Sequence, residues 1–197
     1  APKDGTYIAM LRKDVAQTQV LRPKGIKYDS AKFEWIGGMN SAAVGIVAVW
    51  HTAPAISVEQ AKSKQVLLGG TGKGGEAYMH PILMNSLVGT KFKVIIGYRG
   101  IADIDKAIEA GEVNGRGGSW LGIKALRQHW IKGGKIIVLV QVGVRRSPDL
   151  PNVPLLMDLA KTADDKAVAE FISTSSLTGR TICAPPGTVP ARVAALR

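Results

Sequence analysis

The residues most suited to chemistry in this chain form the glycine-rich run 69–75, which reads Gly-Gly-Thr-Gly-Lys-Gly-Gly. Glycine permits positive φ angles and close backbone approach, so successive N–H groups of such a run can converge on an anion. Thr71 adds a hydroxyl and Lys73 a positive charge. An expected helix follows, and its free N–H groups and dipole also favour an anion. We therefore predict that Gly72 and Gly74, together with Thr71 and Lys73, hold an anionic group.

The same run also fits a dinucleotide-binding pattern. The spacing Gly-x-Gly-x-x-Gly is met at Gly70, Gly72 and Gly75, between an expected strand and an expected helix. The next strand should then end in an acid that binds the ribose, but it ends in Tyr98 and Arg99. Because an arginine at this place suits a 2′-phosphate, an NADP-binding oxidoreductase fragment is an alternative interpretation.

Two further segments carry polar groups where strands are expected to end. The first contains the hydroxyl of Tyr98 and the guanidinium of Arg99, followed by Gly100. The second, 116–119, ends in Ser119. Ligands of open parallel sheets gather outside the carboxyl ends of the strands, so we expect these side chains to meet the same ligand as the glycine run. The alternative is a tyrosine at the edge of the core, a solvated arginine and a plain turn.

Catalytic arrangements are poorly represented. The chain has no Gly-x-Ser-x-Gly elbow, and its one cysteine, Cys183, lies in an apolar context without a histidine partner. Asp103 and Asp105 are two residues apart on an expected helix, so with Glu109 they indicate a solvated face. Metal-ligand spacing is absent among the histidines His51, His80 and His129. We expect a protein that binds its ligand without a metal, a cofactor or a covalent step, and therefore not an enzyme.

The composition is that of a folded protein with an excess of positive charge. The chain has 197 residues, of which 46% are hydrophobic and 21% are charged, and no stretch approaches the roughly 20 apolar residues that span a bilayer. The formal net charge of +11 comes from 26 Lys and Arg against 15 Asp and Glu. Because the basic residues are scattered, without a dense run or interleaved aromatics, nucleic acid is not an expected partner. The excess fits an acidic small ligand or a solvated basic surface.

Short β-rich runs alternate with segments of helical period. Strands are expected at 6–11, 44–50, 65–68, 91–98, 135–142 and 180–184, with a short extended piece at 113–118. Helices are expected at 58–63, 76–88, 101–110, 120–131 and 164–173. The apolar face of the second helix is expected to consist of Met79, Ile82, Leu83 and Leu87, with Pro81 as a kink or first turn. The alternation predicts an α/β fold with a mostly parallel sheet covered on both faces.

The flanks of the chain differ from this alternating middle. The proline-rich segment 147–154 is not expected to be regular structure. A discontinuous division follows, in which residues 1–43 and 141–197 belong to lobe 1. Residues 44–140 would form lobe 2, the ligand-binding βα domain.

The order of the motifs resembles a known family. The segments that carry the resemblance are 1–7, 33–37, the glycine run, 97–100, 111–113, 146–154 and 184–188. Together they are similar to the Bug, or TctC-like, periplasmic solute receptors of tripartite tricarboxylate transporters. The resemblance runs through nearly the whole chain. The segments that form the two ends of the family's proteins have no counterpart in it, so we expect a fragment with a signal peptide upstream of residue 1.

The resemblance implies a two-lobed, Venus flytrap clamp that closes over a small carboxylate in the periplasm. Such a receptor would be a monomer that delivers its ligand to membrane transporter subunits. The family's ligand-binding positions correspond here to Thr71, Gly72, Gly74, Tyr98, Arg99, Gly100 and Ser119. A similar two-lobed shape also occurs in the effector-binding domain of transcription regulators, which is a second alternative.

The chain departs from the family pattern at three positions near the expected site. Tyr78 stands where the family usually has a histidine, Ala107 where an aspartate is common, and Gly118 where an acid is common. An alternative for this chain is therefore that it binds ligands other than the carboxylates usual for the family.

Overall fold

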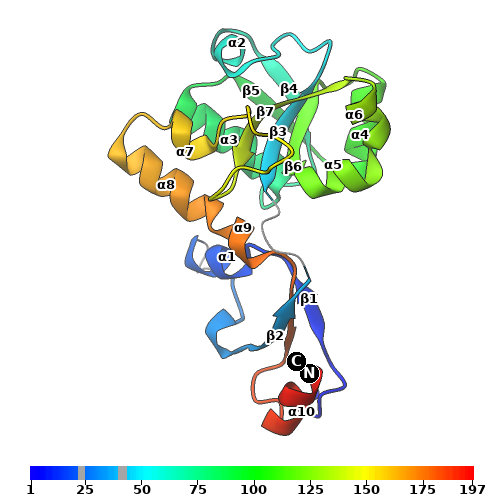
Figure 1. The fold of residues 1–197 in the computed structure, drawn as a ribbon, viewed down its shortest axis with the longest axis vertical. Coiled ribbons are helices and arrows are strands. Elements are labelled where there is room, and N and C mark those ends of the chain that lie inside the picture. Colours follow the sequence, from blue (N-terminus) through cyan, green and yellow to red (C-terminus); the bar gives the residue numbers. More distant parts are fainter. Residues whose placement is uncertain (22–24, 40–43) are drawn as a thin grey trace. The chain divides into compact units, whose positions relative to one another are not determined.

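The computed structural model describes residues 1–21, 25–39 and 44–197. The chain divides into two compact units (Figure 1): unit 1 comprises Ala1–Ala42 and Thr174–Arg197, and unit 2 comprises Ala43–Ser173. Each unit has its own sheet.

Unit 1 is built on a three-stranded antiparallel sheet in the order β1-β8-β2. Its strands are β1 (Ala9–Leu11), β2 (Glu34–Gly38) and β8 (Thr181–Ala184), and its helices are α1 (Val15–Leu21), η1 (Ser30–Lys32), α9 (Ser175–Thr178) and α10 (Pro190–Leu196). The central strand therefore comes from the C-terminal part of the chain. Cys183 of this strand is buried, and burial raises the pKa of its thiol, which fits the structural role expected for it.

Unit 2 is built on a five-stranded sheet in the order β5-β4-β6-β3-β7. Its strands are β3 (Gly45–Trp50), β4 (Val66–Gly70), β5 (Phe92–Ile96), β6 (Gly115–Ser119) and β7 (Ile136–Val142). β4 is parallel to both β5 and β6, whereas β3 is antiparallel to both β6 and β7. The expectation of mostly parallel sheets was therefore wrong for β3 and for unit 1.

The sequence did not indicate the direction of β3, because a central strand is buried on both faces whether it is parallel or antiparallel to its neighbours. The residues of β3 from Gly45 to Val49 are all buried. This antiparallel strand therefore has the same continuous apolar sequence as a buried parallel strand. The connection from β3 to β4 carries one short helix, α2 (Val58–Ser63), which Ser57 caps by accepting from the N–H of Gln60. A parallel connection usually needs a longer helix that crosses the sheet.

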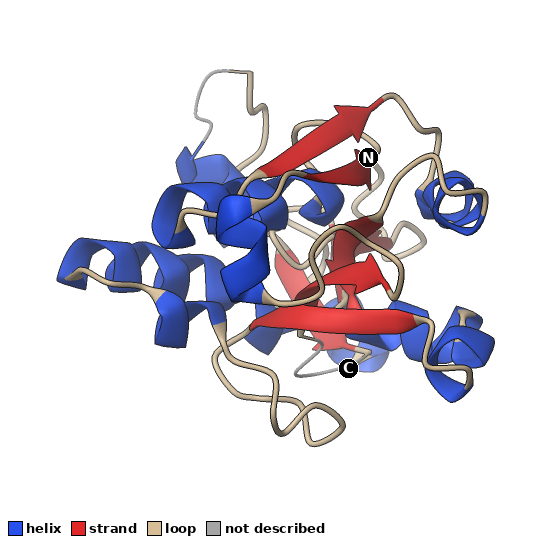
Figure 2. Cartoon of the chain, turned by 90° about the horizontal axis from the view of Figure 1, so that it is seen from above, coloured by secondary structure: helices blue, strands red, loops and turns tan. Residues whose placement is uncertain are grey.

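The other helices of unit 2 cover both faces of the sheet, as expected (Figures 1 and 2). They are α3 (Glu76–Val88), α4 (Ile101–Glu109), α5 (Trp120–Leu126), α6 (Gln128–Lys132), α7 (Leu156–Leu159) and α8 (Ala163–Ser173). On one face Val47 and Val49 join a core with α3, α7 and α8. On the other face Ile46 and Ala48 pack with α5. The single helix expected at 120–131 is interrupted at Arg127, whose φ of −134° and ψ of 38° are not helical.

The buried face of α3 differs from the predicted one. Its buried residues are Ala77, His80, Pro81, Met84, Leu87 and Val88. Of the four residues expected there, Leu87 is buried and the other three are half-buried. Glycines in the sheet explain the difference: a Cβ at Gly117 would lie 3.1 Å from Cδ of Pro81, and a Cβ at Gly45 would overlap the ring of His80. The helix can approach the sheet closely only through this face, and it runs through Pro81 without a break.

The chain returns to unit 1 at Thr174, and not at residue 141 as expected. The residues between are held to unit 2 by the core, because Leu156 of α7 and Ala169 of α8 are buried in the same cluster as Val140. The proline-rich loop is held by Gln141, which is fully buried and donates to the carbonyl oxygens of Leu150 and Val153. A buried amide that satisfies loop carbonyls stabilises the loop on the sheet.

Candidate functional site

Three neighbouring parallel strands of unit 2 end at one edge of the sheet. They are β5, β4 and β6, and they lead directly into α4, α3 and α5. We call the residues at this edge the rim: 71–75, 97–100 and 117–119. The N-cap residues of the three helices, Gly75, Gly100 and Ser119, make no side-chain cap hydrogen bond. The N-cap residues of α3 and α4 therefore supply no side-chain acceptor for the first N–H groups of these helices.

The glycine run is divided between two roles. Gly69 and Gly70 lie within β4, opposite Ile95 and Ile96 of β5, and not in the loop as expected. A Cβ at Gly69 would lie 2.5 Å from Cγ2 of Ile104, so this glycine is required for packing of α4 on the sheet. The loop therefore begins at Thr71.

The remaining residues of the run form a tight turn before α3. The N–H of Gly75 donates to the carbonyl oxygen of Gly72 over 3.2 Å. The hydroxyl oxygen of Thr71 lies 3.3 Å from where a Cβ of Gly75 would stand, so it sits over the start of the helix. Thr71, Lys73 and Gly74 are exposed, and Gly72 is half-buried. The turn thus offers a hydroxyl, an ammonium and the helix start at one place.

The positive φ angles predicted for glycines occur in the other two rim segments. Gly97 has a φ of 120° and Gly118 a φ of 152°. After Gly97 the ring of Tyr98 packs against the core formed by α4 and α6. Burial raises the pKa of Tyr98, and the nearby carboxylate of Glu112 raises it further, so the phenol is a neutral hydrogen-bond donor. Arg99 is exposed.

Ser119 closes β6 and is half-buried at the rim, opposite Gly45 of β3. The next residue is fixed firmly: Trp120 Nε1 donates to the carboxylate of Asp149 over 3.0 Å, and Lys124 pairs with the same oxygen over 2.6 Å. These contacts attach α5 to the proline-rich loop. The position of the serine is therefore set from both sides.

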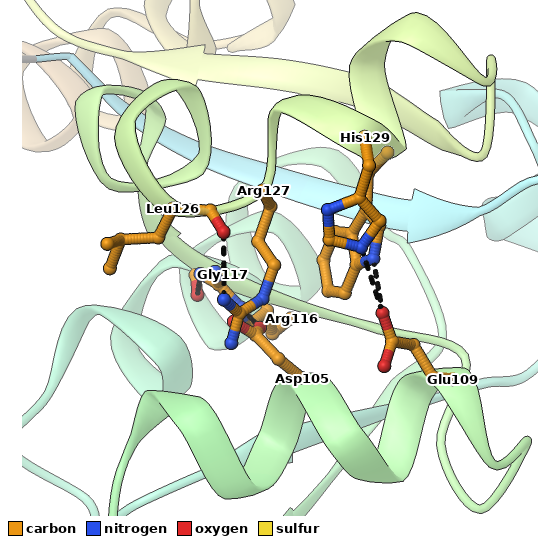
Figure 3. A network of polar contacts seen from close by, with 8 residues as sticks. Asp105, Glu109, Arg116, Gly117, Leu126, Arg127 and His129 are labelled. Carbon is orange, nitrogen blue, oxygen red and sulfur yellow. Dashed lines mark hydrogen bonds and ion pairs between the residues drawn. The ribbon is translucent and has the colours of Figure 1, made fainter.

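A buried ion network lies behind the rim (Figure 3). Asp105 of α4 accepts from Arg116 Nε through one oxygen, over 2.6 Å, and pairs with Arg127 Nε through the other, over 2.9 Å. The side chains of Asp105 and Arg116 are 3% and 4% exposed. The solvated face predicted for Asp105 was therefore wrong, and 116–119 is a strand and not a plain turn.

A second group of contacts adjoins this network. Glu109 accepts from Trp130 Nε1 over 2.7 Å and lies 3.3 Å from His129 Nε2, as Figure 3 shows for the histidine. The hydrogen bond from Trp130 lowers the pKa of Glu109 most, and the hydrogen bond from His129 lowers it further by a smaller amount. The guanidinium of Arg127 also lies over the ring of Trp130, 5.7 Å from its centre. These contacts join α4 to α6.

Within the described part of the chain, no group of three His, Cys, Asp or Glu side chains could hold a metal ion. No helix among the described residues is long and apolar enough to cross a membrane.

Comparison with known proteins identifies the fold. No family model matches the chain, and no curated protein matches it. Solved structures do match over 100% of its length. A TctC solute-binding protein from Polaromonas, without ligand, is 23% identical with a TM-score of 0.66, and 63% of that chain is covered. A Rhodopseudomonas palustris protein with adipate is 18% identical with a TM-score of 0.71, and 62% is covered. MatC from Rhodopseudomonas palustris, with bound malate, is 18% identical with a TM-score of 0.68, and 64% is covered.

The chain has the fold of a TctC-type solute-binding protein. The expected α/β architecture of the periplasmic-binding-protein type is confirmed, apart from the strand directions noted above. The chain spans less than two thirds of the length of these solved proteins, with 62% to 64% of each covered.

Within this solute-binding fold, the three departures from the family pattern have different settings. Tyr78 is half-buried in the first turn of α3. Ala107 is 4% exposed in the core beside Tyr98, where an added carboxylate would be desolvated. Gly118 lies directly above Arg116, because a Cβ there would be 2.5 Å from Nη1 of that arginine.

Sequence reasoning missed Arg116, Asp105 and Arg127 as partners. One signal was available: an arginine between glycines, in Gly-Arg-Gly-Gly-Ser, is a poor sequence for a central strand unless its charge is compensated. The identity of the compensating acid required the fold.

Proposed function

We propose that this chain is part of an extracytoplasmic solute-binding receptor that captures a small carboxylate for a tripartite tricarboxylate-type transporter. The observation that carries the proposal is the rim, where three neighbouring parallel strands end in segments that supply N–H groups, hydroxyls and positive charge. The rim segments contain no acidic residue. Such a surface suits a carboxylate, which accepts hydrogen bonds and carries negative charge.

In the proposed complex, the N–H groups around Gly72 and Gly74 bind one carboxylate group, together with the start of α3. Thr71, Tyr98 and Ser119 donate hydroxyl hydrogen bonds to the ligand, and Gly100 lets its backbone approach. Lys73 and Arg99 are exposed and attract the anion before it binds. Binding of this kind needs no nucleophile and no cofactor, so the ligand is released unchanged.

The two ligand-bound proteins of the same fold favour a dicarboxylate. One carries adipate and the other malate, and both molecules have two carboxylate groups. We extend this class of ligand to the present chain, and with it a periplasmic location, a monomeric receptor and membrane transporter subunits as partners. Nucleic acid has no place in this proposal.

A thermal-shift panel of mono-, di- and tricarboxylates on the full-length protein tests the proposal. Dicarboxylates are expected to raise the melting temperature, because a ligand that binds only the folded state stabilises it. Replacing Thr71→Val and Tyr98→Phe together should reduce that shift. Thr52→Val, an exposed change after β3 at the opposite edge of the sheet, is the matched control. No shift with any carboxylate, or a shift that the double variant leaves intact, would contradict the carboxylate site.

A further inference from the structure

The guanidinium of Arg116 has N–H groups that no described residue accepts. The side chain lies in β6 and is 4% exposed. Its Nε donates to Asp105 over 2.6 Å, and its Nη1 donates to the carbonyl oxygen of Gly117 over 3.3 Å. Nη2 makes no hydrogen bond to any residue in the described ranges 1–21, 25–39 and 44–197. Since a guanidinium carries two N–H groups on each Nη, part of its hydrogen-bonding capacity remains for a further partner.

Asp105 holds this guanidinium at one nitrogen only. One carboxylate oxygen of Asp105 accepts from Nε of Arg116, and the other pairs with Nε of Arg127 over 2.9 Å. Both oxygens therefore have a partner already, and the hydrogen bond at Nε fixes the plane of the Arg116 guanidinium. A charged group that is buried with unused donors costs free energy, unless a bound molecule supplies the acceptors.

The end of this guanidinium lies at the rim. Its Nη1 is 2.5 Å, and its Cζ 3.8 Å, from the position that a Cβ of Gly118 would take. Because residue 118 is a glycine, no side chain of this residue covers the guanidinium. Arg116 is level with Gly69 in the pairing of β6 with β4, so Gly118 and Thr71, two residues farther on, reach the rim from neighbouring strands. Such strands are about 5 Å apart, which places the guanidinium within reach of a small ligand held by the turn 71–75.

We propose that Arg116 is a ligand-binding residue, whose Nη1 and Nη2 groups bind the second carboxylate of a dicarboxylate held at the turn 71–75. The inference rests on the proposed carboxylate-binding function. An arginine suits this role, because its planar N–H groups can bind both oxygens of one carboxylate and its charge strengthens these hydrogen bonds. The contact also specifies the ligand class. A monocarboxylate leaves the guanidinium without its partner, so dicarboxylates bind more tightly.

Calorimetry on the full-length protein with matched pairs of ligands tests this contact. In 3-hydroxybutyrate a methyl group replaces one carboxylate of malate, and hexanoate is related to adipate in the same way. Arg116→Lys keeps the charge that pairs with Asp105 but loses the planar fork. It should raise the Kd of the dicarboxylate on the order of tenfold, and that of the monocarboxylate less than about twofold. Arg127→Lys is the matched control, because it makes the same change at the other arginine on Asp105. It should leave the ratio of the two Kd values as in the wild type.

A crystal structure of the wild-type protein with the tighter-binding dicarboxylate avoids the risk that Arg116→Lys does not fold. An oxygen of the ligand is expected within about 3 Å of Nη1 or Nη2. A ligand with both carboxylates away from Arg116 would overturn the inference. Equal weakening of both members of a pair by Arg116→Lys would do the same, as would an Arg127→Lys variant that changes the ratio as much. A wild-type protein that binds no mono-, di- or tricarboxylate would instead refute the proposed function.

Discussion

In β6, the guanidinium of Arg116 lies where a side chain at position 118 would stand, so only a glycine fits at Gly118. A Cβ on Gly118 would lie 2.5 Å from Nη1 of Arg116, and the φ of Gly118 is 152°. The rim therefore has no side chain at this place, and the guanidinium lies behind the bare backbone. This pair connects the stability of the sheet to the surface on which the ligand is proposed to bind.

Gly118→Ala is expected to destabilise the protein by about 2–4 kcal/mol, because the new side chain meets both an unfavourable φ and the buried guanidinium. Gly122→Ala is the matched control: this glycine lies within α5, with its nearest contact at 4.0 Å. It should stabilise the protein by roughly 0.5–1 kcal/mol, since alanine favours the helix. Urea denaturation measures both changes. Equal effects at the two positions would contradict the packing described here.

Asp105→Asn is expected to cost about 3–5 kcal/mol of unfolding free energy, because it leaves two guanidiniums without the buried charge that compensates them. Asp103→Asn, two residues earlier on the same helix, should cost less than about 1 kcal/mol, since its carboxylate is not in the network. Thermal or urea unfolding of the two variants provides the comparison. A small loss for Asp105→Asn would show that the network contributes little to stability.

Glu109→Gln is expected to remove a pH-dependent contribution to stability. The pKa of Glu109 is lowered from 4.5 in the folded protein by Trp130 and His129, so its stabilising effect is present above about 4.5 and is lost as the pH falls through the folded pKa. The wild type should exceed the variant in stability at pH 7, and the difference should shrink toward pH 3.5. The glutamine keeps an oxygen for Trp130, so the change isolates the charge. A difference that grows on acidification would contradict this assignment.

NADPH is expected neither to bind nor to quench tryptophan fluorescence, although Gly70, Gly72 and Gly75 match a dinucleotide pattern. Gly70 lies inside β4 opposite Ile96, and the next strand provides no acid for a ribose. Trp120 directly follows Ser119 at the rim and serves as the internal reporter. Titrations with NADPH and with malate, measured by fluorescence on the same sample, separate the two interpretations. Saturable quenching by NADPH would favour the oxidoreductase alternative.

The sequence by itself determined the elements whose signals are local. The helix Glu76–Val88 was predicted with its observed ends, and so was the short helix α2 at 58–63. Capping residues, breakers and periodicity act over a few positions, so they can be read without the fold. The order of motifs along the chain also predicted the solute-binding fold that the solved structures confirm.

Only the tertiary structure decided which segments meet. Asp105 and Arg116 are 11 residues apart and belong to a helix and a strand, so neither residue's surroundings in the sequence indicate its partner. The antiparallel direction of β3 depends on its pairing with β6 and β7, and an apolar strand buried on both faces carries no sign of its direction. The pairing of distant segments is set by packing throughout the core, which a local pattern does not contain.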